Sequence, residues 1–168
     1  MEDGFMRYLV FYLNISFISF YAGRILPRKW FRYDRFPYRS WKLEQNGKLY
    51  ERLGIKNWQN RLPDMSKVFP KIMPPKNMSG QYKDRLPIMI QETCIAEFTH
   101  VALCIVGLHG LTLWDNPLRF PLTFLYICVF NVPYVMIQRY NRPRLVRLYR
   151  KLLANLQTES PVSSTVNA

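Results

Sequence analysis

The sequence predicts an all-α integral membrane protein with three transmembrane helices and a basic, aromatic-rich cytoplasmic membrane-surface segment between the first and second. Although 49% of the 168 residues are hydrophobic, the mean hydropathy is only -0.15, because the formal net charge is +13. Hydrophobic and charged residues must therefore be segregated along the chain. Apolar runs of the length that crosses a bilayer occur at residues 5–26, 96–114 and 120–137. We expect one membrane domain over residues 1–156 and a disordered, Ser/Thr-rich tail at residues 157–168.

The run at residues 5–26 is expected to be an uncleaved first span. The rival interpretation is a secretory signal peptide, which has a basic start and a small-residue cleavage site. Here Glu2 and Asp3 make the start acidic, and no such site precedes Pro27. The length of the run also favours a span.

Residues 27–90 differ in character, because they carry more than half of the chain's Lys and Arg, interleaved with aromatic residues. Between two spans, this composition is typical of an interfacial segment lying on the anionic leaflet of a membrane. Nucleic acid is not an expected partner, because no recognised binding motif accompanies the charge. We predict a turn at Asn46-Gly47 and a short helix over residues 49–58. The prolines that interrupt the chain beyond this helix are Pro63, Pro70, Pro74 and Pro75.

A stripe of polar side chains marks one face of the second span. We expect Pro87 in the first turn of this helix and Asp84 as its cap. At helical spacing, one face carries Glu92, Thr93, Ala96, Glu97, His100 and Cys104. The opposite face is apolar and suits lipid, with Ile95, Phe98, Val101, Ala102, Ile105 and Val106. Gly107 and Gly110 share the polar face and would let another helix approach closely.

Glu97 and His100 are the ionisable residues of this stripe within the span. An ionisable side chain inside a membrane costs several kcal/mol unless it faces protein or water, so such residues indicate a functional site. The alternative is a buried Glu–His pair that only locks helices together.

The third span contains Asn131 and Pro133. Proline removes an intrahelical hydrogen bond and kinks the helix. Asn131 beside such a kink would either hold a substrate group or form a helix–helix hydrogen bond, and the sequence leaves both open. The span is followed by the basic octapeptide Gln138-Arg-Tyr-Asn-Arg-Pro-Arg-Leu145.

The distribution of charge predicts the orientation of the chain. Residues 27–87 and the segment after Ile137 are strongly basic, whereas the N-terminus and the loop at residues 115–119 are not. Three spans put the two basic regions on the same side, which the positive-inside rule makes cytoplasmic. We therefore expect a multi-pass protein of the cell membrane, with its N-terminus outside and its C-terminus in the cytoplasm.

The polar stripe and the arginines suit acyl transfer. Glu97 lies one helical turn before His100, so its carboxylate is predicted to orient the imidazole, which would then act as a general base toward a hydroxyl. Clustered arginines suit phosphate groups or a developing oxyanion. Together these parts indicate acyl transfer to an alcohol from a phosphate-bearing donor such as a thioester carrier. The Gly-x-Ser-x-Gly elbow, the P-loop and the dinucleotide-binding fingerprint are absent from the sequence.

Several of these residues also occur in a known family. They are Glu92-Thr93, Ala96-Glu97, His100, Asn131-x-Pro133 and the octapeptide, together with Pro27, Lys29, Phe31-Arg32, Ser40, Glu44, Gly47-Lys48 and Trp58. Through them the chain, from Pro27 to about Leu148, resembles the glycosyl-4,4'-diaponeurosporenoate acyltransferases, small membrane enzymes of staphyloxanthin-type carotenoid synthesis. The resemblance implies transfer of a fatty acyl group to the primary hydroxyl of the sugar on a glycosylated carotenoid acid, or on a similar glycolipid.

The expected roles follow from the physical interpretation of the residues. His100 is the predicted base, with Glu97 as its orienting partner and Glu92 as a second polar group of the catalytic set. The predicted substrate-binding residues are Asn131, Gln138, Arg139, Asn141, Arg142 and Arg144. No metal or cofactor is expected apart from the acyl donor, acyl-coenzyme A or acyl carrier protein. The expected partners are a bilayer with an anionic leaflet, this donor and a glycosylated lipid acceptor, and a homo-oligomer that shares helices is compatible with the sequence.

Two other classes of function remain open at the level of sequence. Glu92, Glu97 and His100 could instead ligate a divalent metal, because Glu-x-x-His occurs in helical metal sites. The chain could also be a non-catalytic membrane protein that docks a partner enzyme or anionic lipid through its basic surface.

Overall fold

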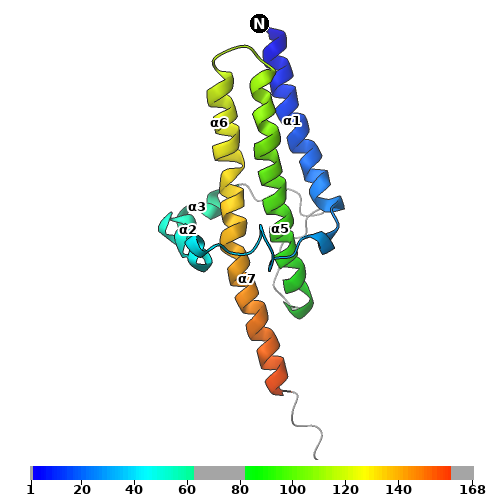
Figure 1. Cartoon of the computed structure of the whole chain (residues 1–168), viewed down its shortest axis with the longest axis vertical. Coiled ribbons are helices and arrows are strands. Elements are labelled where there is room, and N and C mark those ends of the chain that lie inside the picture. Colours follow the sequence, from blue (N-terminus) through cyan, green and yellow to red (C-terminus); the bar gives the residue numbers. More distant parts are fainter. Residues whose placement is uncertain (1, 63–81, 160–168) are drawn as a thin grey trace, which may run out of the picture. The chain divides into compact units, whose positions relative to one another are not determined.

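A computed structural model describes residues 2–62 and 82–159, and every regular element within these ranges is helical (Figure 1). The long helices are α1 (Glu2–Ile25), α5 (Tyr82–Gly107), α6 (Arg119–Phe130) and α7 (Val132–Glu159). The short ones are η1 (Arg28–Trp30), η2 (Lys42–Gly47), α2 (Lys48–Arg52), α3 (Ile55–Trp58), η3 (Gln59–Arg61) and η4 (Leu108–Thr112).

The chain divides into two compact units, each of which is described by itself. The first, which we call the span unit, comprises residues 1–39 and 91–139. The second, which we call the basic unit, comprises residues 40–90 and 140–168. The predicted single domain over residues 1–156 stays a prediction. Of the predicted tail, residues 157–159 end α7, and the remainder lies outside the described residues.

Three helical stretches are long and apolar enough to cross a membrane, which confirms the all-α, three-span prediction. They are Asp3–Ile25, Arg85–Thr112 and Arg119–Gln157, the last of which is interrupted where α6 ends and α7 begins. In the span unit α1, α5 and α6 lie side by side (Figure 1). The polar stripe and the apolar face of α5 separate largely as predicted: Thr93 and Glu97 are buried, while Phe98, Val101 and Ile105 are exposed. The prediction is wrong for Ile95, which was placed on the lipid face but is buried in a cluster with Phe31 and Cys94. The cytoplasmic position of the basic segment stays a prediction.

A tyrosine of α1 ties the three helices together. The Tyr12 hydroxyl donates to the carbonyl oxygen of Gly107 at 2.6 Å and lies 2.9 Å from the Thr123 hydroxyl of α6. Two glycines of α5 and η4 leave room for these rings, because a Cβ at Gly110 would overlap the Tyr12 ring and a Cβ at Gly107 would lie 3.1 Å from the Tyr126 ring. The predicted role of these glycines in close helix approach is therefore confirmed. Inside a membrane, such hydrogen bonds and small residues hold helices together, since lipid is as apolar as the packed side chains.

Two local predictions need correction. Helix α5 begins at Tyr82, so Asp84 lies inside the helix instead of capping it, and Pro87 lies beyond the first turn. The predicted helix over residues 49–58 is two short helices, α2 and α3, because Gly54 between them has a left-handed φ of 69°. Pro63, Pro70, Pro74 and Pro75 lie outside the described residues.

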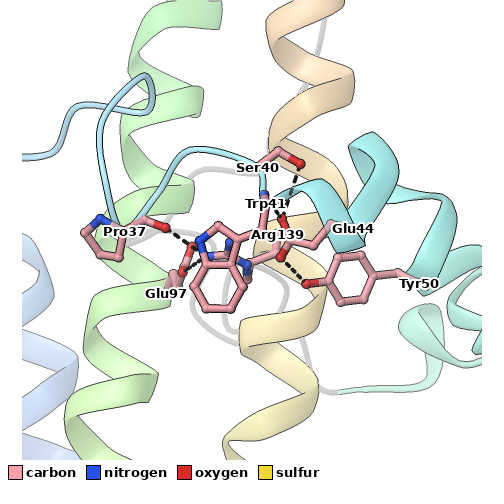
Figure 2. A network of polar contacts seen from close by, with 7 residues as sticks. All are labelled: Pro37, Ser40, Trp41, Glu44, Tyr50, Glu97 and Arg139. Carbon is pink, nitrogen blue, oxygen red and sulfur yellow. Dashed lines mark hydrogen bonds and ion pairs between the residues drawn. The ribbon is translucent and has the colours of Figure 1, made fainter.

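The basic unit is organised around a buried carboxylate, that of Glu44. Its oxygens accept hydrogen bonds from the Ser40 hydroxyl at 3.2 Å, the Trp41 backbone N–H at 2.8 Å and the Tyr50 hydroxyl at 2.6 Å (Figure 2). Three donors compensate for the desolvation of an anion whose residue is only 3% exposed. Directly after it the chain turns sharply at Asn46-Gly47, which confirms the predicted turn.

We expect Tyr12→Phe to lower the free energy of unfolding by about 1 kcal/mol, because it removes the hydroxyl that bridges α1, α5 and α6. Tyr21→Phe is the matched control, since Tyr21 lies on the same helix and is 49% exposed. Unfolding of purified protein in mixed micelles by a denaturing detergent measures both. Equal destabilisation by the two substitutions would contradict the account of helix packing.

Candidate active site

The candidate site lies where α5 passes the junction between α6 and α7, all within the span unit. Nδ1 of His100, on α5, lies 3.0 Å from Oδ1 of Asn131. The imidazole ring also stacks on Tyr134, with ring centroids 4.8 Å apart and an interplanar angle of 8°. A hydrogen bond at one edge and an aromatic ring on one face together fix the position and the orientation of the imidazole.

The break between α6 and α7 puts Asn131 in this position. Pro133 lacks the N–H that would continue the helical ladder, and Asn131 has a non-helical backbone with φ of -126° and ψ of -51°. Helical bonding resumes at once, because the N–H groups of Tyr134 and Val135 both donate to the Asn131 carbonyl, at 3.1 and 3.2 Å. The predicted kink beside a polar residue is therefore present. The Asn131 side chain forms the helix–helix hydrogen bond that the sequence left open.

The surroundings of Asn131 decide which nitrogen of His100 carries the proton. Nδ2 of Asn131 donates to the Tyr126 carbonyl oxygen at 3.0 Å, so the amide oxygen is the atom that faces His100. An amide oxygen can only accept, so Nδ1 of His100 must be the donor. In the neutral imidazole the lone pair then belongs to Nε2. Nε2 has no hydrogen-bond partner among residues 2–62 and 82–159, which leaves it able to accept a proton.

Glu97, one turn before His100 on α5, forms an ion pair with Arg139 of α7. The distance from Nη1 of Arg139 to Oε1 of Glu97 is 2.5 Å, and the same nitrogen donates to the Pro37 carbonyl oxygen at 3.1 Å (Figure 2). The side chains of Arg139 and Glu97 are only 8% and 6% exposed. Each charge is therefore desolvated and depends on the other for compensation. The prediction that Glu97 orients His100 is therefore wrong. Glu97 pairs with Arg139, and His100 contacts Asn131.

The other predicted site residues lie apart from His100 or in the basic unit. Glu92 forms a half-exposed ion pair with Arg28, at 3.4 Å, and Gln138 is half-buried on α7. In the basic unit, Arg142 is buried, Asn141 is half-buried, and the exposed Arg144 lies over the Tyr140 ring at 4.9 Å.

Tyr134 and the carbonyl groups of Tyr126 and Pro37 contact the candidate site residues but were not predicted from the sequence. Tyr134 follows Asn131 by three residues, a spacing that places two side chains of a helix near each other and is a usable signal. The two carbonyl groups carry no signal in the sequence, because every residue has one.

The metal hypothesis finds no support in the arrangement of side chains. Within the described ranges no three His, Cys, Asp or Glu side chains gather closely enough to hold a metal ion. Glu92, Glu97 and His100 instead contact Arg28, Arg139 and Asn131, respectively.

The sequence profile of a protein family described as glycosyl-4,4'-diaponeurosporenoate acyltransferase matches residues 27–151, which include His100, Asn131 and Arg139. The chain belongs to this family. Relatives with the same description come from Staphylococcus aureus strains MRSA252 and N315. They are 28% and 27% identical to this chain over 150 residues, which is 88% of the chain and 86% of each relative. No solved structure matches the chain.

Membership of this family makes the chain an acyltransferase, and the three candidate spans make it a membrane protein. The prediction of an acyltransferase is confirmed, which decides against the non-catalytic docking hypothesis. The other predicted roles of individual residues and the predicted orientation in the membrane stay predictions.

We expect Arg139→Gln to lower the free energy of unfolding by about 3–5 kcal/mol, because it removes the charged partner of the buried Glu97 carboxylate. The double variant Glu97→Gln/Arg139→Gln should lose less than the sum of the two single variants. Denaturing-detergent titration of the four proteins measures the coupling. The exposed pair Arg32 and Asp34 is the control and should show almost none; strict additivity at Glu97 and Arg139 would contradict a compensated buried pair.

Proposed function

We propose that this enzyme transfers a fatty acyl group from a thioester donor to a sugar hydroxyl of a glycosylated carotenoid acid or a similar glycolipid. The description of the family and of its relatives supports the class of acceptor. The observation that carries the chemistry is the His100 imidazole, held in one tautomer by Asn131. The donor we propose is acyl-coenzyme A or acyl carrier protein.

In the proposed reaction His100 is the catalytic residue and acts first as a general base. Nε2 of His100 takes the proton of the sugar hydroxyl while the hydroxyl oxygen attacks the thioester carbonyl carbon. The new C–O ester bond forms and the C–S bond breaks. The leaving thiolate recovers the proton from the imidazolium, so the imidazole returns to its starting state and the products are an ester and a thiol.

Asn131 is a positioning residue in this proposal, because it acts through His100. Its amide oxygen holds the Nδ1–H, and its own orientation is fixed by the Tyr126 carbonyl. Stacking on Tyr134 prevents the ring from turning away. A base that is already oriented loses less entropy when the reacting groups meet, which lowers the barrier.

Arg139 supplies positive charge to the same region. Its ion pair with Glu97 and its bond to the Pro37 carbonyl hold the guanidinium in place beside the helix that carries His100. In a desolvated site a fixed cation stabilises negative charge that develops on the thioester oxygen, because there is little water to screen it. In this proposal Glu97 therefore positions Arg139 and does not position His100.

The acceptor can approach from the bilayer. Phe130 and Val132, which flank Asn131 at the junction of α6 and α7, are exposed apolar side chains. The long polyene chain of a carotenoid can lie against such side chains within the hydrocarbon region while its sugar reaches the polar residues. The proposed acceptor thus has the amphipathic character that a site within a spanning helix requires.

We expect His100→Ala to lower the rate of acyl transfer about 100-fold to 10,000-fold, because it removes the general base. His109→Ala is the matched control, since His109 is the chain's other histidine and is exposed on η4. Both variants and the wild type are expressed in cells that make the glycosylated carotenoid acid, and total lipids are analysed by mass spectrometry. The expected product is the acceptor with the mass of one fatty acyl group added, absent only with His100→Ala.

Asn131→Leu tests whether Asn131 positions His100 or binds the acceptor. The acylated product is again detected by mass spectrometry, but with purified protein so that kcat and KM can be measured. The substitution should lower kcat while leaving KM for the acceptor unchanged, because Asn131 holds the base and not the substrate. Transfer that survives in His100→Ala at the rate of His109→Ala would show that His100 is not the base. Absence of the acylated product with wild-type protein would mean a different acceptor.

A further inference from the structure

The basic unit contains a cavity that the proposed chemistry of His100 does not use. Its volume is about 460 Å³, and it is lined by Gln45, Asn46, Lys48, Glu51 and Arg147. The first two residues belong to η2, the next two to α2, and Arg147 to α7. Residues that are about a hundred positions apart in sequence thus line one cavity, and all of them lie within the same unit.

The lining carries an excess of positive charge. Neither Lys48 nor Arg147 forms an ion pair with any residue in the described ranges. The acidic residue of the lining, Glu51, is already engaged: the Lys56 ammonium lies 3.0 Å from its carboxylate, and the Tyr140 hydroxyl donates to it at 3.3 Å. Lys56 accordingly holds the pKa of Glu51 below its ordinary value. The charge that remains for a ligand is therefore that of Lys48 and Arg147.

The wall of the cavity holds a strained backbone. Gln45 and Asn46 are consecutive residues other than glycine in the left-handed region, with φ of 46° and 56°. Such a conformation is rare and costs energy, and it persists where the surroundings enforce it. Glu44, bound by its three donors, fixes the chain on one side of the strained pair. Gly47 fixes it on the other, because it packs so closely on Tyr140 that an added Cβ would lie 3.3 Å from the ring.

We propose that this cavity binds the phosphate groups of a coenzyme A thioester, the acyl donor of the reaction. Lys48 and Arg147 would pair with the phosphate oxygens, and the side-chain amides of Gln45 and Asn46 would donate to them. The inference rests on the proposed function, since it names the donor of that reaction. It also differs from the sequence-based expectation that Arg139, Arg142 and Arg144 bind the phosphates of the donor or the oxyanion. Arg139 and Arg142 are buried, and the exposed Arg144 lies over the Tyr140 ring, whereas Lys48 and Arg147 are exposed and line the cavity.

The size of the cavity favours a large polar ligand over a single ion. A volume of about 460 Å³ is within the range of small-molecule sites in proteins. Coenzyme A carries a diphosphate and a separate 3'-phosphate, so two cations held on different helices can engage it at more than one point. A fixed wall adds affinity, because little conformational freedom is lost when the ligand binds.

The test measures binding of coenzyme A to the full chain in nanodiscs of uncharged phosphatidylcholine by isothermal titration calorimetry. Lys48→Gln and Arg147→Gln should each raise the Kd about tenfold, because each removes one charge-assisted hydrogen bond. Arg52→Gln on α2 and Arg150→Gln on α7 are matched controls, since each removes one exposed cation from the same helix without lining the cavity. Dephospho-coenzyme A should bind more weakly, and pantetheine, which has no phosphate, should not bind.

An unchanged Kd for coenzyme A in Lys48→Gln and Arg147→Gln, relative to the two controls, would overturn the proposal. Nanodiscs that contain phosphatidylglycerol test the other source of phosphate. If these variants bind coenzyme A normally but lose affinity for that lipid, the cavity binds a lipid headgroup instead. Lipid analysis of whole cells distinguishes this from failure of the proposed function, because acyl transfer can be observed whether or not coenzyme A binds here.

Discussion

The hydrogen bond between His100 and Asn131 is the interaction on which the candidate site depends. It joins α5 to the junction of α6 and α7, and it exists because Pro133 breaks the third apolar stretch at that point. An unbroken helix would leave Asn131 an ordinary helical residue with no defined partner for its amide. The break gives its oxygen to His100 and its nitrogen to the Tyr126 carbonyl. Asn131, at this break, thus accepts from Nδ1 of a histidine on another helix.

Other polar side chains of the span unit also have partners inside the protein, as polar groups within a membrane require. Tyr12 forms hydrogen bonds with Thr123 and with the Gly107 carbonyl, and Glu97 and Arg139 form a buried ion pair. These contacts hold the helices together, while Asn131 and Tyr134 define the surroundings of His100. In the proposed mechanism Glu97 and Arg139 contribute to both stability and catalysis, so a substitution at either is expected to affect both.

Much of the fold follows from the sequence, because spans and faces depend on local pattern. The lengths of the apolar runs predicted three spans, and the spacing of Thr93, Glu97 and Phe98 predicted which side of α5 would be buried. The partner of His100 did not follow from local pattern. Spacing on one helix favoured Glu97, but a buried carboxylate needs a counter-charge more than a neutral imidazole needs an acceptor, and Arg139 provides it. Asn131 is 31 residues from His100, and only the packing of the helices brings them together.

In the proposed mechanism His100 is a neutral imidazole with its proton on Nδ1 and its lone pair on Nε2. Nitrogen-15 NMR of the histidine-labelled protein in bilayers tests it directly, because the chain has only two histidines and His109→Gln assigns the signals. We expect a protonated Nδ1 and an unprotonated Nε2 for His100 at neutral pH, and loss of this single tautomer in Asn131→Leu. A proton on Nε2 in the wild-type protein would contradict the account, since Nε2 could not then act as the base.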